Sequence, residues 1–98
     1  MNDYKSIPRN EFFVYCKRAF ESFRLSTYMT DRYLRYIEYI SQYMEDMNID
    51  YYDLNFSLAF QEKIAKADNS PNQRKSKEYS CALSLIDRFI QGLPYVAQ

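Results

Sequence analysis

Arginines and tyrosines recur at helical spacing in the first half of the chain. Tyr28, Arg32, Arg35 and Tyr39 are separated by steps of 4, 3 and 4 residues. At about 100° per residue these steps place all four side chains on one strip of a helix. Guanidinium groups pair with phosphate oxygens and phenol hydroxyls donate to them, so the strip fits a phosphate backbone.

A second basic strip opens the last quarter of the chain. Three of the four residues from 74 to 77 are basic and none is acidic, although the net charge of the chain is zero. Helix N-termini attract anions, and small polar side chains allow close approach to a groove. Both strips also fit ordinary solvated helix faces, which most helical bundles carry. The second strip, at steps of 3, 4, 3 and 4 residues with Lys75 and Ser80 beside it, consists of Arg74, Lys77, Cys81, Ser84 and Arg88.

The absence of histidine and the single glycine exclude several kinds of active site. No Ser-His-Asp triad, Cys-His pair or histidine-based zinc site can form. Asp50 and Asp53 lie close together in the sequence, but without a calcium-loop pattern they are interpreted as turn and cap residues. A tyrosine nucleophile needs a neighbouring base and cationic groups, which the chain does not supply as a set. We therefore expect no catalytic residue, no metal and no cofactor.

The cysteine and hydropathy patterns indicate a compartment. Cys16 and Cys81 lack CxxC spacing and predict two reduced thiols on helices. No apolar run approaches the roughly 18–20 residues of a membrane span, and the first residues have no apolar signal core. We expect a cytoplasmic protein that has no membrane partner.

Length and composition favour one small helical domain over residues 1–98. The length of 98 residues falls at the lower end of the roughly 100–200 residues typical of a domain. Hydrophobic residues make up 47% of the chain, too many for intrinsic disorder. The 11 tyrosines and 7 phenylalanines can bury a large area in a small core.

Four amphipathic segments must position the two strips. Their apolar residues recur at three- and four-residue steps, and no segment alternates with period two, so we predict helices and no sheet. The segments span about 8–24, 27–47, 55–66 and 72–91. The expected inner stripes are Phe12, Phe13, Cys16, Ala19, Phe20 and Phe23; Tyr33, Ile37, Ile40, Met44 and Met47; Phe56, Ala59, Phe60 and Ile64; and Tyr79, Ala82, Leu83, Ile86, Phe89 and Ile90.

Short polar residues mark the expected helix ends. Ser6, in front of Pro8, is expected to cap the first helix and Ser26 the second. The third helix is expected to be capped by Asp53 or Asn55. Ser70-Pro71 signals the start of the fourth helix, and Gly92 its end, with Pro94 blocking continuation.

Several short signals follow one another along the chain in a fixed order. Leu25-Ser26-Thr27-Tyr28 opens a long helix, and Asn48-Ile49-Asp50 follows it. A short helix and a polar Ser-Pro loop then lead into a last helix that ends in Arg88-Phe89-Ile90. This order resembles the core-binding domain of tyrosine recombinases, the phage-integrase family, over about residues 12–93.

The resemblance implies an all-α, compact four-helix orthogonal bundle of the SAM-like core-binding type. In that family the second and last helices contact double-stranded DNA and help to clamp it for site-specific recombination, with self-association of sister recombinase subunits on DNA. The family's catalytic domain, with its arginines, histidines and nucleophilic tyrosine, is not within these 98 residues, so no cleavage is expected here. The positions that match the family's DNA contacts are Ser26, Thr27, Tyr28, Arg32, Arg35, Arg74, Lys75, Lys77, Ser80, Ser84 and Arg88.

A small helical interaction protein is the alternative, of the bacteriocin-immunity type or a phage-encoded inhibitor. Tyrosine is enriched at the centres of protein interfaces. On this hypothesis Tyr51 and Tyr52, in the turn after the second helix, are the anchors. A third hypothesis is dimerisation through the tyrosine face of the second helix.

Overall fold

Helices dominate the part of the chain that the computed structural model describes, residues 6–93. The elements are α1 (Phe12–Ser22), α2 (Thr27–Asp46), α3 (Leu54–Ala67) and α4 (Arg74–Ile90), with the 3-10 turns η1 (Arg9–Glu11) and η2 (Pro71–Gln73) before α1 and α4. The all-α expectation and the last three helix ranges are confirmed. Pro94, the expected barrier after the last helix, lies outside the described residues.

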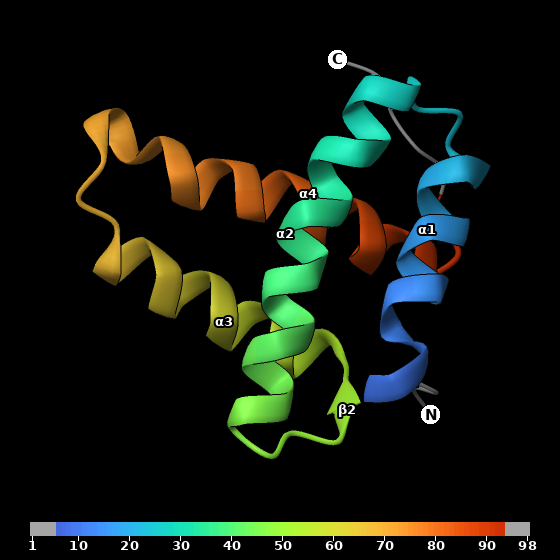
Figure 1. Cartoon of the computed structure of the whole chain (residues 1–98), viewed down its shortest axis with the longest axis horizontal. Helices are drawn as coiled ribbons and strands as arrows, with labels where there is room; N and C mark the ends of the chain where they lie inside the picture. Colours follow the sequence, from blue (N-terminus) through green and yellow to red (C-terminus); the bar gives the residue numbers. More distant parts are fainter. Residues whose placement is uncertain (1–5, 94–98) are drawn as a thin grey trace.

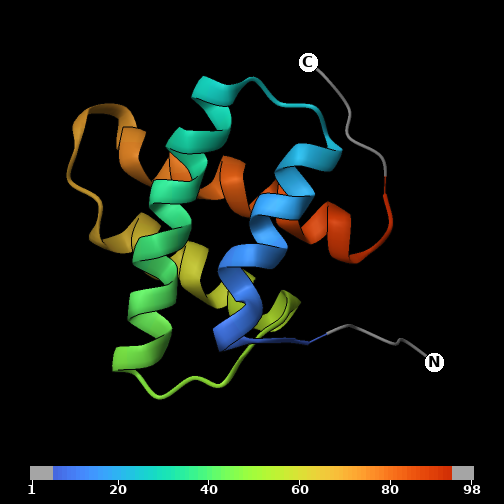
Figure 2. The ribbon, with the colours of Figure 1, turned by 45° about the vertical axis from the view of Figure 1, so that its right-hand side comes forward.

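Two helical hairpins cross one another. In Figures 1 and 2, α1 and α2 lie side by side, while α3 and α4 form a second pair behind them. The view in Figure 1 has α2 upright at the front and α4 running across behind it. Contacts of α4 with both α1 and α2 close the bundle. This crossing brings the N-terminal part of α4 next to α2.

A two-stranded sheet corrects two of the sequence-based expectations. Strand β1 (Ile7–Pro8) pairs antiparallel with β2 (Tyr51–Tyr52), with Ile7 opposite Tyr52. The prediction of no sheet was wrong, because strands of two residues are too short to show an alternating pattern. The prediction that Ser6 caps a helix starting near Pro8 was also wrong: Pro8 is extended and α1 begins at Phe12.

Three helices end in the same way. After α1, α2 and α4 a residue with positive φ is followed by an amide that bonds back to a carbonyl five positions earlier. For α2 the residue is Asn48 (φ 60°), and the Ile49 amide donates to the Met44 carbonyl at 2.8 Å. Gly92 (φ 72°) ends α4 as predicted, since glycine adopts this conformation without a Cβ clash. Arg24 (φ 58°) does the same for α1.

Side-chain caps start the two middle helices. Ser26 Oγ accepts from the Met29 amide at 3.1 Å, as predicted for α2. Asp53 Oδ1 accepts from the Phe56 amide at 2.8 Å, which decides between the two caps considered for α3. Each cap satisfies one of the amides that a helix N-terminus leaves unpaired.

Aromatic rings link the elements through the core. Tyr52 stacks on Phe12 with ring centroids 4.4 Å apart, and its other neighbour is Phe56. The series continues through Phe60 to Tyr79 on α4. Such pairs add to the stabilisation that burial alone supplies. The fully buried side chains around them include Phe20, Ile37, Ile40, Met44, Leu83 and Ile86.

The predicted inner stripes are correct for most positions of α1, α2 and α4. Two predicted inner residues are instead exposed: Met47, which follows the end of α2, and Ala59 on α3. Ser57 is fully buried on α3, although it is polar and was not among the predicted inner residues.

None of the helices between residues 6 and 93 combines the length and the hydropathy of a membrane-spanning segment.

Candidate nucleic-acid interface

The strip predicted on α2 faces outward for most of its length. Tyr28 and Tyr39 are 68% and 65% exposed, and Arg35 is exposed between them. Arg32 is half-buried instead, because its side chain turns toward α4. Its Nη1 also donates to the hydroxyl of Tyr28 at 3.2 Å.

The two residues before this strip have different roles in the fold. Ser26 is exposed, but its hydroxyl is occupied as the cap of α2. Thr27 is exposed as the first residue of the helix. Neither lines the groove described below.

The strip predicted on α4 is exposed at its basic end. Arg74, Lys75 and Lys77 are all exposed, as is Ser84 near the middle of the helix. Ser80 and Arg88 are half-buried, so they present only part of their side chains. The opposite face of α4 carries the buried residues Ser76, Tyr79, Ala82, Leu83, Leu85, Ile86 and Ile90.

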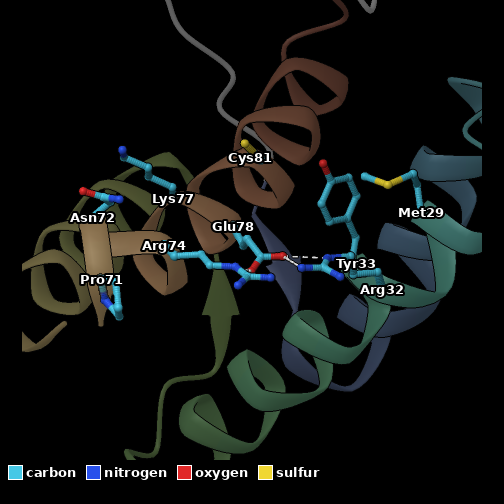
Figure 3. Close-up of a pocket in the computed structure, with 9 residues that line it drawn as sticks. All are labelled: Met29, Arg32, Tyr33, Pro71, Asn72, Arg74, Lys77, Glu78 and Cys81. Atoms are coloured by element: carbon cyan, nitrogen blue, oxygen red, sulfur yellow. Dashed lines mark hydrogen bonds and ion pairs between the residues drawn. The ribbon is translucent and has the colours of Figure 1, made fainter. Parts of the chain in front are cut away.

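A groove of about 490 Å³ lies where α2, η2 and α4 meet. Figure 3 shows Met29, Arg32 and Tyr33 reaching it from α2, and Arg74, Lys77, Glu78 and Cys81 from α4. Three predicted site residues therefore meet here: Arg32, Arg74 and Lys77. Lys75 lines a neighbouring hollow instead. The other predicted residues, which do not line this groove, are Ser26, Thr27, Tyr28, Arg35, Ser80, Ser84 and Arg88.

Glu78 lies between the cations of the groove. Arg32 Nε donates to Glu78 Oε1 at 2.6 Å, and Arg74 Nε lies 3.9 Å from Oε2 (Figure 3). Burial alone would raise the pKa of Glu78, but hydrogen bonds from Arg32 and Tyr36 and the two positive charges hold it below its usual value. The same hydrogen bond raises the pKa of Arg32. Glu78 is therefore ionised at neutral pH.

Sequence reasoning missed Glu78. Glu78 directly follows the basic segment 74–77, which contains no acidic residue of its own. The i,i+4 spacing of Arg74 and Glu78 was a usable signal, because such pairs face each other on a helix. The contact with Arg32, 46 positions away, has no local signal.

The carboxylate of Asp68 already occupies the N-terminus of α4. Asp68 Oδ2 accepts from the Ser76 amide at 2.8 Å, and Oδ1 accepts from the Ser70 amide at 2.9 Å. The Lys75 amide donates to Ser70 Oγ at 3.3 Å. Hydrogen bonds from the Ser70 hydroxyl and from the backbone amides of Ser76 and Ser70 lower the pKa of Asp68 to about 2. A phosphate at this end of α4 would therefore meet side chains rather than the helix amides, which corrects the expectation drawn from the helix N-terminus.

A second polar cluster, also missed, lies in the core away from the groove. Asp87 on α4 accepts from the Tyr52 hydroxyl at 2.6 Å and from Ser57 Oγ at 2.5 Å. Gln61 Nε2 donates to Ser57 Oγ at 2.9 Å. Burial raises the pKa of Asp87, and the two hydroxyls oppose that shift. The cluster joins β2, α3 and α4.

This cluster corrects the alternative hypothesis. Tyr52 is fully buried and cannot anchor a partner, although it follows a turn in the sequence. Tyr51 remains 55% exposed, because successive residues of a strand point to opposite faces.

The two cysteines are free thiols, as predicted. Cys16 is buried and burial raises its pKa, whereas Cys81 is exposed at the groove. Across residues 6–93 no group of three or more histidine, cysteine, aspartate or glutamate side chains is placed to hold a metal ion.

Comparison of the chain with described protein families, with curated proteins and with solved structures finds no match.

Proposed function

We propose that this protein binds duplex DNA as a domain of the core-binding type found in tyrosine recombinases, holding DNA for site-specific recombination. The observation that carries the proposal is the meeting of Arg32 from α2 with Arg74 and Lys77 from α4 at one open groove. These cations come from two segments that are far apart in the sequence. Charged residues that only keep a helix face in water have no need to meet in this way. The order of sequence signals supports the same function.

The exposed cations supply the affinity in this proposal. Arginine can pair with phosphate oxygens through two parallel hydrogen bonds, and lysine adds a compact charge. Lys75 and Arg35 extend the basic surface beyond the groove on α4 and α2. Phosphate contacts fix the position of a protein on DNA but carry no direct sequence information. Sequence choice then comes from side chains that reach base edges in a groove of the DNA. Ser80 and Ser84 on α4, which lie outside the protein groove, are the candidates.

A binding titration tests this function. The probe is a labelled random duplex, and fluorescence anisotropy is measured at about 50 mM and about 200 mM salt. Binding that weakens steeply with salt is the expected result, because neutralised phosphates release counterions. A variant with Arg74, Lys75 and Lys77 changed to alanine should lose most of this binding.

A matched variant controls for net charge. Lys17 and Arg18 on α1 and Lys66 on α3 are exposed and do not line the groove. Changing these three to alanine removes the same charge and should weaken binding far less. Equal losses in the two variants, or no binding by the wild type at the lower salt, would count against the proposed function.

The alternative function, a small helical interaction protein, keeps one observation in its favour. Tyr28, Tyr39 and Tyr51 are large side chains that are more than half exposed. If the duplex does not bind, alanine variants of these three tyrosines become the first test for a protein partner. Sedimentation of the wild-type protein then tests the third hypothesis, dimerisation through α2.

A further inference from the structure

One acidic side chain stands among the basic residues of the groove. Of the described residues that line it, Glu78 alone carries a negative charge. Its two carboxylate oxygens face different partners, Oε1 toward Arg32 and Oε2 toward Arg74. Two of the three groove cations therefore share one carboxylate within the protein itself, which offsets one of their two charges.

The contact with Arg32 is more sheltered than an ordinary surface ion pair. The side chains of Arg32 and Glu78 are 34% and 21% exposed, whereas those of the pair between Lys66 and Glu62 on α3 are 76% and 70% exposed. Water and salt screen the inner pair less. Glu78 therefore lowers the positive potential of the groove more than its single charge would elsewhere on the surface.

We propose that Glu78 acts as an internal competitor of DNA: in the free protein it occupies Arg32 and Arg74, and a duplex phosphate must displace it from them. This inference rests on the proposed DNA-binding function. Lys77 lines the same groove and is exposed, and Figure 3 shows its ammonium group pointing away from Glu78. Lys77 is then the first cation to meet the duplex, and the two arginines exchange partners afterwards.

Removing the charge of Glu78 tests the exchange. Glu78→Gln keeps the size of the side chain and its capacity to accept a hydrogen bond. It should tighten duplex binding by roughly two- to fivefold at about 50 mM salt, the range that corresponds to an ion pair of modest strength. The gain should shrink at about 200 mM salt, where free charges are screened more. Circular dichroism verifies that the variant is folded.

Two controls separate local competition from net charge. Glu62→Gln removes the same charge from an ion pair on α3 that does not line the groove, and it should leave affinity nearly unchanged. In an Arg32→Ala background, Glu78→Gln should give a smaller gain, since one of the two released cations is missing. An equal gain from Glu62→Gln, or an undiminished gain without Arg32, would overturn the inference.

The outcomes also separate this inference from the proposed function. If the wild type binds and Glu78→Gln binds no tighter, the inference fails while the function stands; weaker binding would mean that Glu78 orients the arginines instead. If neither protein binds, both fail. A measurement on the wild type covers the case in which the variant does not fold: the Arg32 Nε–H resonance should shift as duplex is added, and an unchanged resonance at saturation would overturn the exchange.

Discussion

The hydroxyl of Tyr52 lies 2.6 Å from Asp87 Oδ1 and joins the short strand β2 to the last helix. The two residues are 35 positions apart, and the second oxygen of the same carboxylate accepts from Ser57. Asp87 thus holds β2 and α3 against α4, which also carries the basic strip. The stability of the bundle and the position of the groove depend on the same helix.

Loss of the Asp87 carboxylate should destabilise the protein strongly. Asp87→Ala leaves the hydroxyls of Tyr52 and Ser57 without their acceptor, at a cost of about 2–4 kcal/mol in the free energy of unfolding. Tyr52→Phe removes one donor and should cost about 1–2 kcal/mol. Urea unfolding followed by circular dichroism measures both. Asp46→Ala, at the exposed end of α2, is the control, with an expected change under about 0.5 kcal/mol; equal effects of Asp46→Ala and Asp87→Ala would refute the role of the cluster.

Asp68 should contribute to stability only above acidic pH. Its pKa falls from an ordinary value of 3.8 to about 2 in the folded protein. The folded state therefore binds fewer protons than the unfolded state in this window, and the stabilisation is present above 3.8 and lost as the pH falls toward 2. Unfolding measured over this range should show the gap between wild type and Asp68→Asn closing as the pH is lowered.

Asp87 should give the opposite sign in the same kind of experiment. Burial raises the pKa of Asp87 in the folded protein above its ordinary value of 3.8. The contribution of Asp87 to the free energy of unfolding is therefore largest below pH 3.8, and it declines as the pH rises through the raised pKa. Relative to Asp87→Asn, the wild type should therefore gain stability as the pH is lowered. Parallel curves for the Asp68→Asn and Asp87→Asn variants would contradict both assignments.

Ser26 should stabilise α2 as its N-terminal cap. Its hydroxyl caps the helix by accepting from the Met29 amide. Ser26→Ala should lower the free energy of unfolding by about 1 kcal/mol. Ser84→Ala, on the exposed face of α4, should change it by less than about 0.5 kcal/mol. Thermal unfolding of the two variants in parallel gives the comparison, and a larger loss at Ser84 would contradict it.

The two thiols should react at very different rates. Cys81 is exposed at the groove, while Cys16 is buried and its raised pKa keeps it protonated. A maleimide reagent should label one thiol in the native protein and two in denaturant, as counted by mass spectrometry. Bound duplex should slow the labelling of Cys81, since it lines the groove. Rapid labelling of Cys81 at saturating duplex would show that DNA does not cover this surface.

Lys77 should contribute one phosphate contact to the salt dependence of DNA binding. If it neutralises one phosphate, Lys77→Ala reduces the slope of log K against log salt by about 0.9. The loss of affinity should be similar for duplexes of different sequence, because a phosphate contact does not read bases. The control is Lys17→Ala on α1, which should leave the slope unchanged.

Local signals were enough to predict the helices and the direction of their faces. The apolar stripe of α2, its cap at Ser26 and the end of α4 at Gly92 depend on residues within one or two turns of each other. The outward position of Tyr28, Arg35 and Tyr39 follows from the same periodicity. These features were correctly predicted because near neighbours in the sequence determine them.

Packing between distant elements brings particular charges into contact. Arg32 and Glu78 are in contact only because α2 crosses the start of α4, and the crossing depends on packing between residues far apart in the sequence. The pairing of Ile7 with Tyr52 likewise buries a tyrosine that local context left at the surface. Periodicity along the chain predicts the two helix faces that carry the basic strips. Contacts between distant residues join part of these faces in one groove and place a carboxylate inside it, and such contacts leave no periodic signal in the sequence.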